Sequence, residues 1–345
     1  MRDSDVALNK YKELPWVLII ISYDKIIRYD NMYLVDVLSK YVNTIVYLVD
    51  FGSFNVKVHN YAGRLYNKVS NRKYVSRVMF KILRSVVNRK VSLERVVKNP
   101  NLIDLIFVVD PVRVNFDFKP FKNAVRAYWS QDCIHGGDYY AQVFSDVLDY
   151  DVVFCAHKPY MYRFPSGKTY WLPFACNPKF HRRINLPFVY DLVFVGNVPS
   201  QRSKYGYVRR ELLMYLGERL SNYKVFVGNA YQHDMVWLYN KSKVVLNVSR
   251  VGELNWRVFE VLGCGRLLLT DRNAEVGELF NDKEHLVMYS SKDELVELAK
   301  YYIEHDYERE KIAERGYMEC RKNHTLDHRV KTVLERTIGF KIEVN

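Results

Sequence analysis

The sequence has 345 residues, of which 49% are hydrophobic and 15% aromatic, so it is too apolar for a disordered protein and long enough for two domains with separate cores. It has no apolar run of about 18 residues that could cross a bilayer, and its five scattered cysteines lack the spacing of a disulfide framework or a zinc site, which favours a cytoplasmic protein without a metal. The net charge is +13, and residues 1–190 hold nearly all of it, with 28 Lys/Arg against 16 Asp/Glu.

Apolar and amphipathic runs alternate along the first half of the chain. Continuous apolar runs that are separated by helical patterns favour a parallel sheet with helices on both faces. The predicted strands are 16–21, 44–50, 102–111, 124–132, 150–158 and 169–178, and the predicted helices are 30–42 and 139–149.

A strongly basic segment, residues 57–98, interrupts this alternation with twelve Lys/Arg and a single acid, Glu94. Its apolar residues from Val75 to Val86 recur three to four positions apart, which predicts an amphipathic helix with a basic face. Such a helix could rest on an anionic membrane surface or contact nucleic-acid phosphates, and a solvated face without a partner is the plain structural interpretation.

The alternation then starts again, after an irregular stretch at 182–190. We therefore expect two Rossmann-like, doubly wound domains, 1–185 and 186–345, which face a central cleft at the carboxyl ends of their strands. We also expect the last helix to pack back on the N-terminal domain. The predicted strands are 191–197, 224–229, 243–249, 266–271 and 285–290, and the predicted helices are 207–220, 234–242, 253–263, 275–280 and two closing helices across 292–335.

The helix at 253–263 carries the polar residues that point most clearly to a ligand. A helix this apolar is buried, and buried helices seldom carry an Arg and a Glu three residues apart unless those groups face a cleft. Arg257 at the start of the helix could bind a diphosphate together with the helix dipole, Asn255 precedes it, and Glu260 could accept hydrogen bonds from ribose hydroxyls. The alternative is an internal Arg–Glu pair.

Two strands end in Gly-Asn turns, where backbone N–H groups could approach a phosphate. The first contains Gly196 and Asn197 and is followed by Arg202; the second contains Gly228. Neither a P-loop nor a G-x-G-x-x-G follows a predicted strand, which disfavours a nicotinamide dehydrogenase. Tyr239 and the segment 229–233 are candidates for contacts with the nucleotide base, or for plain structure.

In their order and spacing, these segments resemble the nucleotide-binding half of GT-B glycosyltransferases of the glycosyltransferase group 1 families, and in particular the CgeB-like (spore-maturation-type) branch. The resemblance covers residues 186–337, through "DLVFVGN", "YNKSKVVLNVS", "NWRVFEVLGCGRLLLTD", "DELVELAKYYIEHDYEREKIAERGY" and "HTLDHRV". The N-terminal half matches only through "YWSQD", "YDVVFCAHK" and "YWLPFACNP".

The resemblance implies a sugar-nucleotide-dependent glycosyltransferase of the hexosyltransferase type, with a nucleotide-diphosphate sugar such as a UDP-sugar as donor and with the identity of the nucleotide left open. It also implies no cofactor and no metal, because cationic side chains and a helix dipole replace the divalent ion. It places the ribose on Glu260. Many relatives have two glutamates eight positions apart, whereas Glu253 and Glu260 are seven apart, so Glu253 receives no role here and Asn255 or the backbone of residues 251–252 could fill that place.

Transfer to an acceptor hydroxyl also needs a base. Asp132 ranks first because it follows a predicted strand and precedes a glycine-bearing loop; His135 and Asp24 come behind it, and each could equally be a turn residue. The expected partners are a sugar nucleotide and an anionic, lipid-linked or membrane-surface acceptor. The alternatives are a non-catalytic nucleic-acid- or membrane-binding protein, a DNA-modifying glycosyltransferase, and a sugar-nucleotide epimerase.

Overall fold

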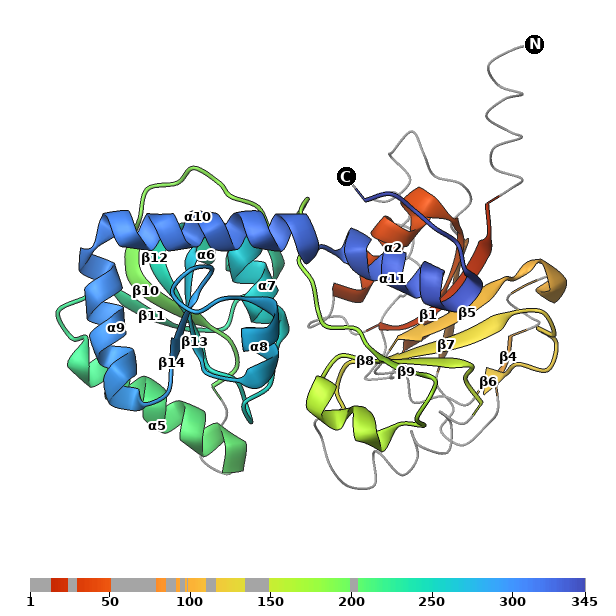
Figure 1. Ribbon diagram of the computed structural model, residues 1–345, viewed down its shortest axis with the longest axis horizontal. Helices are drawn as coiled ribbons and strands as arrows, with labels where there is room; N and C mark the ends of the chain where they lie inside the picture. Colours follow the sequence, from red (N-terminus) through yellow and green to blue (C-terminus); the bar gives the residue numbers. More distant parts are fainter. Residues whose placement is uncertain are drawn as a thin grey trace, which may run out of the picture. The chain divides into compact units, whose positions relative to one another are not determined.

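The computed structural model describes two compact units (Figure 1). Unit 1 comprises Met1–Pro173 and Arg329–Asn345, and unit 2 comprises Phe174–His328. The division falls between Pro173 and Phe174, earlier in the chain than the expected boundary at 185/186, and most of the last helix groups with unit 1. The described residues are 14–23, 30–50, 79–84, 91–93, 97, 99–109, 116–133, 149–198 and 204–344.

Unit 1 contains a seven-stranded sheet in the order β3-β2-β1-β5-β7-β8-β9, and every neighbouring pair is parallel. A second, two-stranded parallel sheet joins β4 to β6. The strands are β1 (Trp16–Tyr23), β2 (Asn43–Asp50), β3 (Met79–Arg84), β4 (Val91–Ser92), β5 (Leu105–Val109), β6 (Phe116–Asp117), β7 (Val125–Ser130), β8 (Val152–Cys155) and β9 (Thr169–Trp171), and the helices are α2 (Asp30–Tyr41), η1 (Pro100–Leu102), η2 (Lys158–Arg163) and α11 (Leu326–Ile338).

The central strands of unit 1 are buried on both faces, as their uninterrupted apolar sequences predict. Every residue of β5 and β8 is buried, and Trp129 in β7 is fully enclosed, with its indole N–H donating to the Leu172 carbonyl at 3.0 Å. Trp129 is therefore a core residue.

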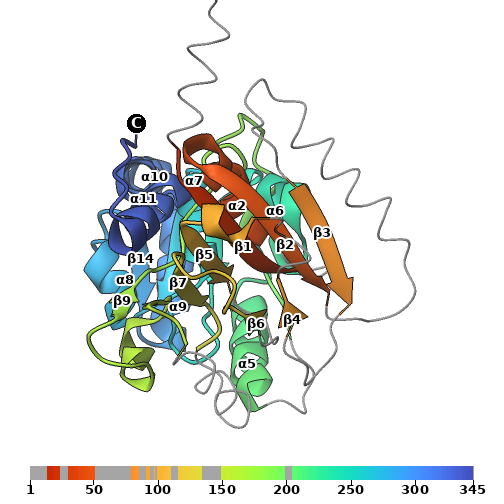
Figure 2. The same cartoon turned by 90° about the vertical axis from the view of Figure 1, so that its right-hand side faces the viewer.

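The helix predicted within the basic segment is wrong for the residues that the structure describes. Met79–Arg84, which the spacing of apolar residues assigned to an amphipathic helix, is strand β3 and pairs in parallel with β2 at the edge of the sheet (Figure 2). Val91–Ser92 is also a strand. The run Met79-Phe80-Lys81-Ile82-Leu83 fits either period, and pairing with β2 decides in favour of a strand. Apart from the buried Leu93 and Val97, the rest of the segment lies outside the described residues, as does most of the helix predicted at 139–149.

Unit 2 contains a five-stranded parallel sheet in the order β11-β10-β12-β13-β14. Its strands are β10 (Tyr190–Val195), β11 (Val225–Gly228), β12 (Ser242–Asn247), β13 (Leu267–Asp271) and β14 (Val287–Tyr289). Its helices are α5 (Lys204–Arg219), α6 (Gln232–Asn240), α7 (Trp256–Gly263), α8 (Ala274–Leu279), α9 (Lys292–Glu304) and α10 (Asp306–Asn323).

The core of unit 2 joins the apolar residues of the sheet to the buried faces of α5, α9 and α10. The closing region has three helices rather than the two expected across 292–335, because the chain breaks at His305 and again at His324–Thr325 before α11. Among the described residues, no helix is both long enough and apolar enough to cross a membrane.

The strand order of unit 2 singles out one place on its sheet. β10 lies between β11 and β12. The chain passes from β10 to β11 on one side and then crosses to β12 on the other side, so the order in which strands are added reverses at β10. In open parallel sheets, ligands bind beyond the carboxyl ends of the strands at this switch point.

Candidate functional site

The carboxyl ends of β10 and β12 bring together several residues that the sequence had singled out. β10 ends at Val195 and runs into Gly196 and Asn197, while β12 ends at Asn247. The helix α7 follows β12 after a short loop, and its first turn supplies Arg257. The site therefore lies at the topological switch point of the unit 2 sheet.

Arg257 is fixed from three sides. Its Nε donates to the Val195 carbonyl at 2.8 Å and its Nη1 donates to Asn247 Oδ1 at 2.6 Å, while Asn255 caps α7 by accepting the Arg257 backbone N–H at 3.1 Å. Asn255 Nδ2 also donates to Asn247 Oδ1 at 3.1 Å. The guanidinium thus ties the ends of β10 and β12 together. It forms no ion pair with Glu260, which argues against the internal Arg–Glu pair.

Gly196 is a glycine because Arg257 occupies the space of a side chain. A Cβ atom at Gly196 would lie 2.3 Å from Arg257 Nη2 and 3.2 Å from Phe194 Cζ, well inside van der Waals contact. The Gly196 N–H donates to the Gly228 carbonyl at 2.9 Å, so the ends of β10 and β11 are joined as well.

Arg209, which the sequence reasoning missed, is the second cation of the site. It projects from α5 and is only 8% exposed. Its Nη1 donates to the Asn197 carbonyl at 3.1 Å and its Nη2 to the Val248 carbonyl at 2.7 Å, so it bridges the turns that follow β10 and β12. Its Nε atom is buried and has no hydrogen-bond partner in the part of the chain that the structure describes.

The two guanidinium groups form a concentrated positive charge. Arg209 Cζ lies 5.7 Å and Arg257 Cζ 4.9 Å from the centroid of the Phe194 ring. Neither arginine makes an ion pair among the described residues; both donate to neutral oxygens. Burial and the neighbouring Arg257 charge lower the pKa of Arg209 to about 10. Because leaving a buried charge uncompensated costs several kcal/mol, this arrangement favours an anionic ligand.

Glu260 lies one turn further along α7 and is 7% exposed. The hydroxyl of Tyr239, on α6, donates to Glu260 Oε2 over a long 3.5 Å. Burial, with the Glu260 charge as a smaller cause, raises the pKa of Tyr239 well above its usual value, so the phenol stays protonated. The Tyr239 side chain is fully buried, and its hydroxyl helps to position the Glu260 carboxylate.

Two carboxylates hold the loop between β12 and α7: Glu253 within the loop and Asp271 at the end of β13. Glu253 accepts the backbone N–H groups of Arg250 at 2.8 Å and Val251 at 2.6 Å. Ser249 binds Asp271 through both its backbone N–H, at 2.8 Å, and its hydroxyl. Burial is the main reason that the pKa of Asp271 is raised. Glu253 therefore shapes the loop.

The other predicted residues lie apart from one another. Asn197 and Gly228 lie at strand ends, where the Asn197 carbonyl accepts from Arg209 and the Gly228 carbonyl accepts from the Gly196 N–H, whereas Asp132 follows β7 in unit 1 and is partly exposed. Arg202, His135 and Asp24 lie outside the described residues.

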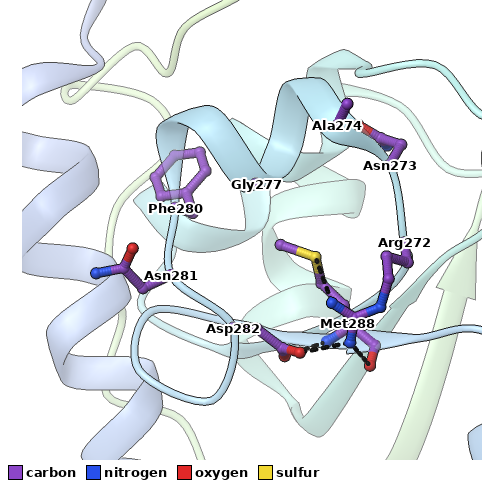
Figure 3. Close-up of a pocket in the computed structure, with 8 residues that line it drawn as sticks. All are labelled: Arg272, Asn273, Ala274, Gly277, Phe280, Asn281, Asp282 and Met288. Carbon is purple, nitrogen blue, oxygen red and sulfur yellow. Dashed lines mark hydrogen bonds and ion pairs between the residues drawn. The ribbon is translucent and has the colours of Figure 1, made fainter.

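A separate pocket of about 490 Å³ lies in unit 2 between α8 and the chain around Met288 (Figure 3). Its charged groups are already paired with each other: Arg272 Nη2 lies 2.6 Å from Asp282 Oδ2, and Asp282 Oδ1 accepts the Met288 N–H at 2.8 Å. This pocket therefore offers no unpaired charge to a phosphate and is not the candidate site.

Comparison with solved structures defines the class of fold. The chain is similar to a glycosyltransferase from Rickettsia africae ESF-5 (12% identity, 94% of this chain and 97% of that chain, TM-score 0.61). It is also similar to Anabaena HepE in complex with UDP and glucose (11%, 93% and 98%, 0.63) and to TarM (7%, 93% and 98%, 0.66). The predicted GT-B-like fold of two parallel-sheet Rossmann-like domains is thereby confirmed.

The C-terminal part of the chain also matches a protein-family model. Residues 192–335 match the protein family described as Glycosyl transferase-like, which confirms the resemblance to group 1 glycosyltransferases for this region. No curated protein sequence matches the chain. The matched region contains the two arginines of the site, Arg209 and Arg257, together with the helix cap Asn255 and Glu260.

Proposed function

We propose that this protein is a glycosyltransferase that moves a sugar from a UDP-sugar to an acceptor hydroxyl. The observation that carries the proposal is a pair of guanidinium groups, the buried Arg209 and the partly buried Arg257, at the switch point of a glycosyl transferase-like domain. Neither has an ion-pair partner among the described residues. HepE, a structural neighbour, has been crystallised with UDP and with UDP-glucose, which supports UDP as the nucleotide.

In this proposal the diphosphate lies against the two arginines. When the bond between the sugar C1 and the β-phosphate oxygen breaks, the electron pair stays on that oxygen, and the leaving UDP gains negative charge. Two fixed guanidinium groups and the amino end of α7 stabilise this charge because they do not have to reorganise during the reaction. We propose on this basis that the protein itself neutralises the diphosphate, without a divalent metal ion.

The ribose is assigned to Glu260. Its carboxylate lies on the same helix as Arg257, three residues on, so the diphosphate and the ribose would contact successive turns of one helix face. A carboxylate accepts two hydroxyl hydrogen bonds at once, which matches the two hydroxyls of a ribose. Tyr239 holds this carboxylate in place from α6.

On the acceptor side, Asp132 is the proposed base. It would take the proton of the acceptor hydroxyl as that oxygen bonds to the sugar C1, which balances the departure of UDP. Its position after β7, at the carboxyl edge of the unit 1 sheet, is where α/β proteins carry functional groups. The hexosyl donor, the CgeB-like branch and a cytoplasmic location stay predictions.

The direct test is calorimetric titration of the purified protein with UDP, UMP, GDP and ADP, followed by UDP-sugars. We expect UDP to bind at least about tenfold more tightly than UMP, because the second phosphate gains charge-assisted hydrogen bonds worth about 1.5–3 kcal/mol. Arg257→Gln should abolish this difference. The control is Arg272→Gln, which removes an arginine that Asp282 already neutralises and should leave UDP binding unchanged.

Turnover provides the second readout. The wild-type protein should release UDP slowly from its UDP-sugar by hydrolysis, and EDTA should not reduce the rate. Absence of nucleotide diphosphate binding by folded protein would reject the transferase proposal and leave the nucleic-acid- or membrane-binding alternative. Binding by Arg257→Gln with unchanged preference for UDP over UMP would reject the assignment of the diphosphate.

A further inference from the structure

Unit 1 carries a cluster of aromatic and cationic side chains at the carboxyl end of its sheet. η2 follows directly after β8, and β9 returns beside β8 (Figure 1, yellow-green). We call the following residues the aromatic–basic face: Lys158, Tyr160, Tyr162, Arg163 and Trp171.

The cations of this face lie over its rings. Lys158 Nζ lies 5.3 Å from the centroid of the Trp171 ring, and Arg163 Cζ lies 4.7 Å from that of Tyr160 and 5.8 Å from that of Tyr162. Lys158 is exposed and Tyr162 is 77% exposed, whereas Tyr160, Arg163 and Trp171 are partly exposed. Cation and ring surface are therefore presented to solvent together.

The face is built into the fold. The Trp171 indole N–H donates to the Ala156 carbonyl at 3.1 Å, and Arg163 Nη1 donates to the Cys133 carbonyl at 2.8 Å. Cys133 directly follows Asp132, the proposed base. Arg163 therefore connects the aromatic–basic face to the turn that carries Asp132.

The stretch of chain that carries the face holds charges of one sign. The sequence has no Asp or Glu from Val152 to Tyr190, and within unit 1 this stretch contains Lys158, Arg163 and Lys168. Lys168 is occupied elsewhere, since its Nζ donates to the Tyr150 carbonyl at 2.5 Å and its charge helps to hold the pKa of Asp151 down, after the stronger contributions of Arg126. Two of the five residues of the face are cations and none is a carboxylate, so the face itself is cationic.

We propose that the aromatic–basic face binds an anionic saccharide, the acceptor of the transfer. Sugar rings present C–H faces that pack on aromatic rings, and their carboxylate or phosphate substituents pair with Lys and Arg. A site next to the base would hold the acceptor hydroxyl where its proton can be removed. The role of this saccharide as the acceptor rests on the proposed transferase function, whereas the binding of an anionic saccharide does not.

The features of the face favour a saccharide over the other anionic macromolecules. Its rings are tyrosines and one tryptophan packed against cations on a six-residue helix and a three-residue strand, a short surface beside a sheet edge. A single-stranded nucleic acid would need a longer track of stacked bases, and a membrane would need a broader basic surface.

The test uses the full chain without nucleotide. Oligogalacturonate, which carries a carboxylate on every sugar, and a malto-oligosaccharide of equal length are titrated into the protein at low and at raised salt. We expect the acidic oligosaccharide to bind about tenfold more tightly, with a preference that falls as salt screens the charges.

Two variants separate charge from ring. Lys158→Gln should weaken the acidic oligosaccharide about fivefold and leave the neutral one unchanged, since it removes one exposed cation. Tyr162→Ala should weaken both, because the lost ring surface is independent of charge. The matched control is Lys241→Gln, which removes a lysine 3.6 Å from the Trp237 ring centroid in unit 2 and should change neither.

Three results would overturn the inference: equal affinity for the two oligosaccharides, no effect of Lys158→Gln and Tyr162→Ala in folded protein, or tighter binding of oligothymidylate or of anionic lipid vesicles at equal charge. UDP titration of the same samples separates the two proposals. Saccharide binding without UDP binding rejects the transferase and keeps the face, whereas UDP binding without saccharide binding rejects the face alone.

Discussion

Gly196 has no room for a side chain, and this makes it the sharpest single-residue test of the donor site. In Gly196→Ala the new methyl group would begin 2.3 Å from Arg257 Nη2, so the guanidinium must move away from Val195 and Asn247. We expect UDP affinity to fall by about tenfold or more, the equivalent of about 1.4 kcal/mol, with loss of the preference for UDP over UMP.

The control for this prediction is Gly217→Ala in α5, where nothing lies within 4 Å of the new methyl group. Its UDP affinity should equal that of the wild type in the same calorimetric titration. Unchanged UDP affinity in Gly196→Ala would show that the position of the Arg257 guanidinium does not matter for the donor.

His181 makes a second prediction, on the pH dependence of stability. It is fully buried, and desolvation lowers its pKa from 6.5 to about 3, with the Asn177 N–H donating to Nδ1 at 3.1 Å. Below pH 6.5 the unfolded chain binds a proton here that the folded chain does not, so stability falls as the pH drops from about 6.5 towards 3. At pH 5 this single group should cost about 2 kcal/mol relative to pH 7.5.

The measurement is denaturant unfolding of the wild type and of His181→Gln between pH 5 and pH 8. Glutamine can still accept the Asn177 N–H but cannot become charged in this range, so the variant should lose less stability on acidification by about that amount. Parallel pH profiles for the two proteins would contradict the assignment of this acid sensitivity to His181.

Of the single residues in the candidate donor site, the sequence predicted some and missed others. Asn255, Arg257 and Glu260 stood out because polar groups in a dense apolar helix are rare. Arg209 did not, because it precedes Arg210 in an ordinary amphipathic pattern, and only the carbonyls of Asn197 and Val248, distant in sequence, explain its burial.

Among the elements, α10 approaches the rest of unit 2 closely at Gly316. A methyl group there would lie 2.0 Å from the His285 carbonyl oxygen and 2.8 Å from Leu262 Cδ2. Because backbone cannot move aside as a side-chain tip can, Gly316→Ala should lower the free energy of unfolding by about 2–3 kcal/mol.

Gly277→Ala in α8 is the matched comparison, since Gly277 faces open space beside the pocket of Figure 3. Here the substitution should raise the free energy of unfolding by about 0.5–1 kcal/mol through helix propensity and a less flexible unfolded chain. Urea unfolding of both variants checks the pair, and equal effects of the two substitutions would contradict the close approach of α10.

Elements of unit 2 were predicted well because each strand is a short apolar run bounded by turn residues and each helix carries a clear period. The prediction failed where a local pattern fits two structures. Met79–Arg84 has apolar spacing that suits a helix, but its hydrogen bonds to β2, a contact between distant segments, make it a strand. Two closing helices were expected across 292–335, but the chain forms three, because it breaks at His305, where the C-cap of α9 meets the N-cap of α10, and again before α11.

For the whole molecule, the sequence predicted two parallel sheets with separate cores, and the structure adds the strand order that locates the site. Alternation of strands and helices implies parallel pairing, but it does not say on which side of β10 the next strands lie. The reversal between β10 and β12 brings Val195 and Asn247 to the same guanidinium, and this meeting is invisible to any local pattern.

The two separate cores lead to a last prediction, on how a donor nucleotide stabilises the chain. A ligand that binds only the folded form of unit 2 should slow the exchange of the most protected amides in β10, β12 and β13, by about 2.7 kcal/mol of opening free energy at a hundredfold excess over Kd. The buried strands β1 and β5 of unit 1, which belong to the other core, should keep their exchange rates. Hydrogen exchange followed by mass spectrometry, with and without UDP, measures both sets of peptides in one sample. An equal gain of protection in β1 and β5 would mean that the two cores unfold cooperatively. A gain of protection confined to unit 1 would contradict the placement of the nucleotide on the unit 2 sheet.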